Sequence, residues 1–193
     1  RISAFARENN IKLIEDCAQA HGAKLGGKPV GTFGDIGAFS MMFGKHTCMG
    51  GQGGAVFTRD EELYKKIRQN SDRGKPFGLP PGSTNCVAAL NFNADELHCA
   101  IGRVQIRKTE KIASGRREVV RKLLESLVHI PAVKPPRLSE GAEPSYWFLR
   151  LMSDSSAVSC DKQAFCDALN AEGVGCVSWY QATPYLYDWY TKR

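Results

Sequence analysis

The stretch Gly37–Gly54, GAFSMMFGKHTCMGGQGG, constrains the fold of this chain most. Its first part is a run of small and apolar residues, which is typical of a buried strand, and this run breaks at Lys45. The glycines that follow predict a tight turn, because glycine adopts backbone conformations that other residues avoid. A lysine at the mouth of a strand, with the Ser40 hydroxyl nearby, is a candidate for chemistry.

Two common phosphate-binding motifs do not fit this stretch. A Walker loop needs glycine six positions before the lysine and a hydroxyl residue after it, whereas Phe39 and His46 stand there. A Rossmann GxGxxG motif is also absent, since residues 51–56 read GQGGAV. We therefore expect the glycines to shape a turn near Lys45.

Strand, loop and helix signals alternate along the chain, which predicts an α/β fold. The expected strands are 11–14, 37–42, 54–58, 145–152 and 173–180, and the expected helices are 2–9, 62–70, 93–127 and 161–172. We expect a capping box over Thr58–Glu61 to open the second helix. Because residues 131–144 form a proline-rich connector, we place one domain in 1–130 and a second in 131–193.

The acidic pair Glu15-Asp16 follows the first predicted strand. Ligands of open parallel sheets bind beyond the carboxyl ends of the strands, so Asp16 can face a cofactor, although it can equally cap the following turn. Pyridoxal phosphate needs an acid near its pyridine nitrogen and a lysine that attaches it. Asp16 and Lys45 are candidates for this pair, and Ser40 is a candidate phosphate ligand. Spacing alone also allows Lys45 to be a surface amine.

Composition narrows the function further. The chain has no run of 18 apolar residues and no signal-peptide pattern, so we expect a cytoplasmic protein that does not enter a membrane. Seven cysteines without a CxxC pair and four scattered histidines argue against disulfides and a metal site. The net charge of +6 owes much to Arg103–Lys122, which lacks interleaved aromatic residues. We interpret it as a solvated helix face, and a nucleic-acid partner is disfavoured.

Four segments, IEDCAQAHGA, GTFGDIGAFS, FGKHTCMGGQGGAVFT and LNFNADELHCAIGRVQI, resemble in order and spacing the DegT/DnrJ/EryC1/StrS family of sugar aminotransferases. The resemblance implies a fold type I enzyme that uses pyridoxal phosphate. It implies part of a large domain, with a mixed, mostly parallel sheet between helices on both faces, and part of a smaller α+β domain.

The same resemblance assigns roles to five residues. It implies that Lys45 carries the cofactor as a Schiff base, that Asp16 meets the pyridine nitrogen, and that Gln19 contacts the ring region. It implies that Ser40 binds the phosphate and that Asn91 reaches the phosphate of a neighbouring subunit. A homodimer with shared active sites follows from the last role.

Three positions depart from the family pattern: Gln52 stands for Glu, Leu90 for Gly and Asn93 for Arg. Family members are about twice as long, and the part that carries a phosphate-binding turn and a ring-stacking aromatic is not in this sequence. We therefore expect this piece alone to be inactive or weak.

The resemblance implies transfer of an amino group from glutamate or glutamine to a keto group of a nucleotide-linked sugar or a cyclitol. Two alternatives stay open. One is the dehydratase branch of the family, which has His in place of the lysine. The other is a non-catalytic basic module that binds nucleic acid or a partner through Arg103–Lys122.

Overall fold

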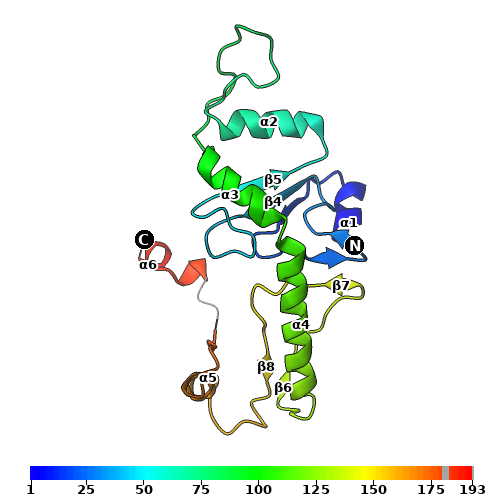
Figure 1. The fold of residues 1–193 in the computed structure, drawn as a ribbon, viewed down its shortest axis with the longest axis vertical. Helices are drawn as coiled ribbons and strands as arrows, with labels where there is room; N and C mark the ends of the chain where they lie inside the picture. The colour runs from blue at the N-terminus through cyan, green and yellow to red at the C-terminus, as the bar shows by residue number, and fades with distance from the viewer. Residues whose placement is uncertain (180–182, 193) are drawn as a thin grey trace. The chain divides into compact units, whose positions relative to one another are not determined.

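The computed structural model describes residues 1–179 and 183–192, which form two compact units (Figure 1). The first unit comprises Arg1–Leu123 and Arg137–Leu149, and the second comprises Leu124–Pro136 and Arg150–Arg193. No helix within the described ranges is long and apolar enough to cross a membrane.

A three-stranded mixed sheet organises the first unit. β4 (Ile36–Ser40) lies in the middle, with β1 (Ile14–Asp16) parallel to it on one side and β5 (Gly54–Phe57) antiparallel on the other. Together with the helices, this sheet confirms the predicted α/β class. The prediction of a buried strand over 11–14 is wrong in both extent and burial. The strand begins only at Ile14, because the Leu13 carbonyl before it accepts hydrogen bonds from the amides of both Asp35 and Ile36. The Ile14 side chain is 64% exposed.

A small second sheet includes a strand from Arg137–Leu149, the later of the two segments that make up the first unit. β2 (Lys24–Leu25) and β3 (Lys28–Pro29) form a hairpin, and β7 (Ala142–Glu143) pairs antiparallel with β2. Gly26 and Gly27 form the two-residue loop, with φ of +57° and +74°. Positive φ at both positions matches the twist of a two-residue hairpin.

The helices of the first unit are α1 (Ile2–Glu8), α2 (Glu61–Ser71), α3 (Glu96–Ile106) and most of α4 (Thr109–Leu127), whose residues from Leu124 onward belong to the second unit. Figure 1 shows α2 running alongside β5. The long helical pattern over 93–127 is therefore two helices, which separate at Arg107 and Lys108. Neither glycine of the pattern makes this break. Gly102 is buried, and a Cβ there would lie 3.4 Å from Met41 and Met49, so it allows close packing.

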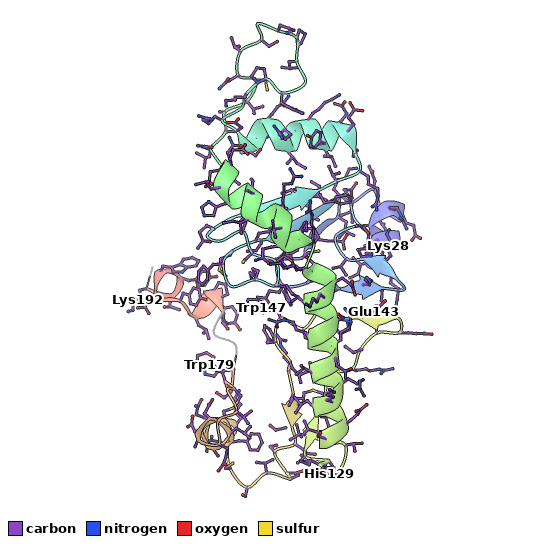
Figure 2. All side chains as sticks on the ribbon, in the orientation of Figure 1. Lys28, His129, Glu143, Trp147, Trp179 and Lys192 are labelled. Carbon is purple, nitrogen blue, oxygen red and sulfur yellow. The ribbon has the colours of Figure 1, made fainter. Side chains whose placement is uncertain are left out.

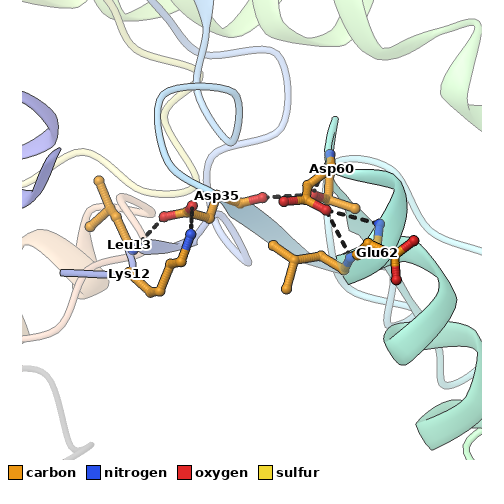
Figure 3. Close-up of polar contacts among 7 residues, drawn as sticks. Lys12, Leu13, Asp35, Asp60 and Glu62 are labelled. Atoms are coloured by element: carbon orange, nitrogen blue, oxygen red, sulfur yellow. Dashed lines mark hydrogen bonds and ion pairs between the residues drawn. The ribbon is translucent and has the colours of Figure 1, made fainter. Parts of the chain in front are cut away.

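The start of α2 differs from the predicted capping box. Asp60 is the N-cap, and its carboxylate accepts hydrogen bonds from the amides of Glu62 and Leu63 (Figure 3). Thr58 instead donates to the Asp35 carbonyl at 2.8 Å and accepts from the Asp60 amide. The Asp60 carboxylate therefore satisfies free amides in the first turn of α2. The Thr58 hydroxyl instead bonds the carbonyl of Asp35, the residue just before β4.

The second unit contains a two-stranded antiparallel sheet and short helices. β6 (Val133–Lys134) pairs with β8 (Met152–Ser153), and α5 (Lys162–Ala171) begins at the N-cap Asp161 and ends before Gly173. A 3-10 helix, η1 (Pro184–Leu186), and α6 (Asp188–Thr191) follow.

The α5 prediction is confirmed, whereas two strand predictions are wrong. Residues 145–151 and 173–179 contain no strand, and Tyr180, the last residue of the second prediction, lies outside the described residues. In the first segment, Arg116 donates to the carbonyls of Tyr146 and Trp147, so a side chain replaces a neighbouring strand. In the second, Cys176 exchanges hydrogen bonds with the Asn170 side chain.

Glu15 fixes the loop that leads into β4. Its carboxylate accepts hydrogen bonds from the amides of Gly31, Phe33 and Gly34 at 2.6–2.8 Å. A Cβ on Gly37 would lie only 2.3 Å from the Gly31 carbonyl oxygen, so the loop passes directly against the strand. Three amides that would otherwise lack partners are therefore satisfied by one side chain.

We predict that Glu15→Gln destabilises the protein by about 2–4 kcal/mol, because an amide group cannot accept from three donors as a carboxylate does. Urea unfolding measures the change. Asp16→Asn is the matched control, since the exposed Asp16 accepts one amide hydrogen bond, from Ala18, and its substitution should cost about 1 kcal/mol or less. Equal losses in the two variants would contradict this role for Glu15.

Candidate active site

Strand register places two predicted site residues on the same face of the mixed sheet. Asp16 is paired with Ala38 across β1 and β4, so their side chains leave the sheet on the same side. Ser40 lies two residues beyond Ala38, and side chains alternate along a strand, so it shares that face. Glu15 points to the opposite face, where it holds the loop described above. The acidic pair therefore divides into a structural residue and a candidate site residue.

A groove of about 1040 Å³ lies over this face, and both Asp16 and Ser40 line it. Its floor comes from β4 and β5, one wall from α2, and the other from residues 88–90 and 92–94. Tyr64, Arg68, Asn70 and Asn93 add polar and aromatic groups to the walls. The groove is thus large enough for a small ring compound, and an acid and a hydroxyl reach it from adjacent strands.

Lys45 lies in a tight loop between β4 and β5. The Met41 amide donates to the Gly53 carbonyl, and the Met49 amide donates to the Met41 carbonyl, so the loop closes on itself. Gly50 has φ of +90°, and a Cβ on Gly53 would lie 2.0 Å from the Met49 sulfur. These constraints confirm that the glycines shape a turn. Lys45 is half-buried, and it is not among the residues that line the groove.

The remaining two predicted residues lie near the groove. Gln19 follows the carboxyl end of β1 and is half-buried. Asn91 forms an isolated bridge with Asp72, and its side chain accepts from the Asn93 amide at 3.3 Å. Asn91 itself does not line the groove, whereas Leu90 and Phe92 on either side of it do.

Beside the lysine, four rings pack in a row that links β4 to the 137–149 segment. Phe39 contacts His21 at 5.7 Å, His21 contacts His46 at 5.7 Å, and His46 contacts Trp147 at 5.4 Å between ring centroids. Figure 2 labels Trp147, and the Nζ of Lys45 lies 4.7 Å from the centroid of its ring. We call Phe39, His21, His46 and Trp147 the aromatic row.

Both histidines of the aromatic row are buried, and burial shifts their titration. Burial lowers the pKa of His21 to about 4, the charge that His46 would gain on protonation and the charge of Lys45 lower it further, and a hydrogen bond with the Ser40 backbone opposes the shift. Burial also lowers the pKa of His46, with a further contribution from Arg116. The His46 Nε2 lies 3.1 Å from the Ser145 carbonyl. The lowered pKa values favour the neutral form of both rings at pH 7.

The residues of the groove and its neighbouring loop fit pyridoxal phosphate. Asp16 offers a carboxylate for a protonated ring nitrogen, Ser40 offers a hydroxyl for the phosphate, and Lys45 offers a primary amine that makes no ion pair among the described residues. These are the three functional groups that the cofactor requires from a protein. In the described ranges, no three His, Cys, Asp or Glu side chains come together as metal ligands would.

The model of the DegT/DnrJ/EryC1/StrS aminotransferase family matches residues 1–193. The chain belongs to this family. The family and the relatives of this chain are aminotransferases that depend on pyridoxal phosphate, and a dehydratase is among its structural neighbours. The resemblance described in the sequence analysis is thereby confirmed.

Individual relatives agree with the assignment to the family. The chain is 32% identical to GDP-perosamine synthase of Escherichia coli O157:H7 over 79% of its own length and 41% of the relative. It is 31% identical to L-glutamine:2-deoxy-scyllo-inosose aminotransferase of Streptomyces kanamyceticus, over 89% of the chain and 42% of the relative. The chain thus spans less than half the length of these aminotransferases.

A solved structure supports the fold. The aminotransferase from Psychrobacter cryohalolentis superposes with a TM-score of 0.88 at 29% identity, covering 98% of this chain and 53% of that one. The chain therefore has part of the fold type I architecture, as predicted.

Three residues around the site were not found from the sequence. Glu15 could have been recognised from strand alternation, since it precedes Asp16 and must face the other way. No local sequence pattern indicated the roles of Trp147 and Arg116. The Arg116 guanidinium donates to the carbonyls of Tyr146 and Trp147 at 2.8 and 3.3 Å, a contact between residues far apart in sequence.

We predict that acid destabilises this family member through the aromatic row. An unfolded histidine has a pKa near 6.5, so between about pH 6.5 and pH 4 the unfolded chain binds more protons than the folded one, and stability falls as pH falls. His21→Phe keeps an aromatic ring and removes the titrating group. Between pH 7 and pH 4.5 it should lose about 1–3 kcal/mol less than the wild type.

Urea unfolding at the two pH values provides the measurement. His129→Gln is the control, because His129 is exposed and its removal should leave the pH dependence unchanged. An unaltered pH dependence in His21→Phe would rule out this origin of acid sensitivity.

Proposed function

We propose that the protein transfers an amino group from glutamate or glutamine to a keto group of a nucleotide-linked sugar or a related cyclitol, with pyridoxal phosphate as cofactor. The observation that carries this proposal is the shared groove of Asp16 and Ser40 with Lys45 in the adjoining loop. Relatives named for nucleotide-linked sugars and for a cyclitol substrate support the substrate class.

Each proposed residue has a separate task toward the cofactor. Asp16 keeps a ring nitrogen protonated through its carboxylate, and Gln19 contacts the ring region. Ser40 donates its hydroxyl hydrogen bond to the phosphate. Lys45 provides the amine of attachment, and Asn91 binds the phosphate held by a second copy of the chain. When bound, pyridoxal phosphate supplies an electron sink that stabilises negative charge next to the amino nitrogen.

Lys45 also moves the proton of the reaction. As a free amine, its Nζ takes a proton from the α-carbon of the amino donor, and the resulting ammonium group can return that proton. The Asp16 carboxylate favours a positive charge on the nitrogen that it faces, which makes the α-proton easier to remove.

The domain organisation and assembly belong to the same proposal. Residues 1–130 form part of the cofactor-binding large domain, and 131–193 form the connector and part of the small domain. Two copies share their active sites, the enzyme acts in the cytoplasm, and the remaining half of a typical family member completes the site. Within the family, Lys45 favours transamination over dehydration, because the dehydratase branch carries His at this position.

The test is an amination assay with the full-length protein, pyridoxal phosphate, glutamate or glutamine, and a set of nucleotide-linked keto sugars and keto cyclitols. We predict an aminated product, a loss of at least a thousandfold in Lys45→Ala, and a smaller loss in Asp16→Asn. Lys66→Ala, an exposed lysine on α2, is the matched control and should stay active. Deoxygenated product without amination would favour the dehydratase alternative, and activity in Lys45→Ala would exclude the proposed role of Lys45.

A further inference from the structure

The environment of Lys45 assigns a role to a residue outside the groove. The Nζ of Lys45 lies 4.7 Å from the Trp147 ring centroid, within the range of a cation–π interaction. The described ion pairs do not include Lys45. The indole is thus the contact that the structure records for the charged end of this side chain.

Trp147 is held firmly at this position. Arg116 donates from one Nη1 to the carbonyls of both Tyr146 and Trp147. Tyr146 has φ of +47°, a conformation that a bulky residue rarely adopts, so the backbone immediately before the indole is bent and must be stabilised by its surroundings. His46 packs against the indole at 5.4 Å and reaches the Ser145 carbonyl.

The aromatic row connects this support to the sheet. His21 contacts His46 on one side and Phe39 of β4 on the other. Phe39 precedes Ser40, so the strand that carries the candidate phosphate ligand is linked through three rings to the indole beneath Lys45. A strained backbone at Tyr146 and two buried histidine rings next to the half-buried Lys45 would be costly unless the position of its amine mattered.

We propose that Trp147 is a positioning residue for Lys45, and that its ring face holds the lysine ammonium group whenever the amine is not bonded to another group. Its meaning for catalysis rests on the proposed function, whereas the contact itself does not. A ring face attracts the charged form of a lysine, so Trp147 holds the ammonium group that is present when Nζ carries a proton, whereas the neutral amine that acts as the base is not held by it. The charged or titratable groups around this contact are His46, His21 and Arg116.

The test measures the pH profile of Lys45 labelling by an amine-selective reagent in the full-length, cofactor-free protein, with each lysine quantified by peptide mapping. In Trp147→Leu, the midpoint of the Lys45 profile should fall, and labelling at pH 8 should rise about two- to tenfold. Trp147→Phe retains a ring with a weaker interaction and should give a smaller change in the same direction. Lys66 serves as the internal reference and should not change.

The midpoint separates positioning from simple exposure, because greater exposure raises the labelling rate without moving the midpoint to lower pH. If Trp147→Leu unfolds, the shift in Trp147→Phe decides the matter. An unmoved Lys45 midpoint in the folded variants, or the same change at Lys66, would overturn the proposal. The assay needs neither cofactor nor substrate, so a failed amination assay would leave it intact.

Discussion

The parallel pairing of β1 with β4 is the constraint on which the rest of the first unit depends. This register fixes the faces of two consecutive acids: Glu15 points to one side and Asp16 to the other. Glu15 then holds the loop before β4 through three amide hydrogen bonds, which brings that loop against Gly37. Glu15 holds the loop on one face of the sheet, and Asp16 lines the groove on the opposite face.

Two separate kinds of support surround Lys45. Its own loop is shaped by backbone hydrogen bonds and by glycines that permit close approach to Met49. The second support comes from residues 145–147, which Arg116 and His46 hold through backbone carbonyls. The candidate groove and the lysine are therefore built by different contacts. Neutral histidines suit this arrangement, since a charged ring would be desolvated at considerable cost in the aromatic row.

Local patterns in the sequence predicted much of this structure. The glycine turn after Lys45 and the strand over 54–58 were predicted because their signals come from neighbouring residues. Pairing partners were harder to predict. The strand expected at 145–152 was replaced by contacts to Arg116, and the long helix pattern broke at Arg107, where no proline or glycine marks the end.

In the candidate site too, residues marked by local sequence patterns could be predicted, whereas contacts between distant segments could not. Asp16, Ser40 and Lys45 stand at strand ends or just beyond them, so their types and order could be recognised from motifs in the sequence. Trp147 could not, because its contact with Lys45 joins segments that are distant along the chain and no local pattern encodes such a pair. Tertiary contacts of this kind become visible only when the fold is known.

We propose that Lys45 is the amine that attaches pyridoxal phosphate. The most direct measurement is to incubate the full-length protein with pyridoxal phosphate, reduce it with borohydride, and map the modified peptide by mass spectrometry. Our account predicts that the pyridoxyl group is found on Lys45, and that Lys45→Ala leaves no stoichiometric modification. A stoichiometric label on another lysine, with Lys45 unmodified, would contradict it.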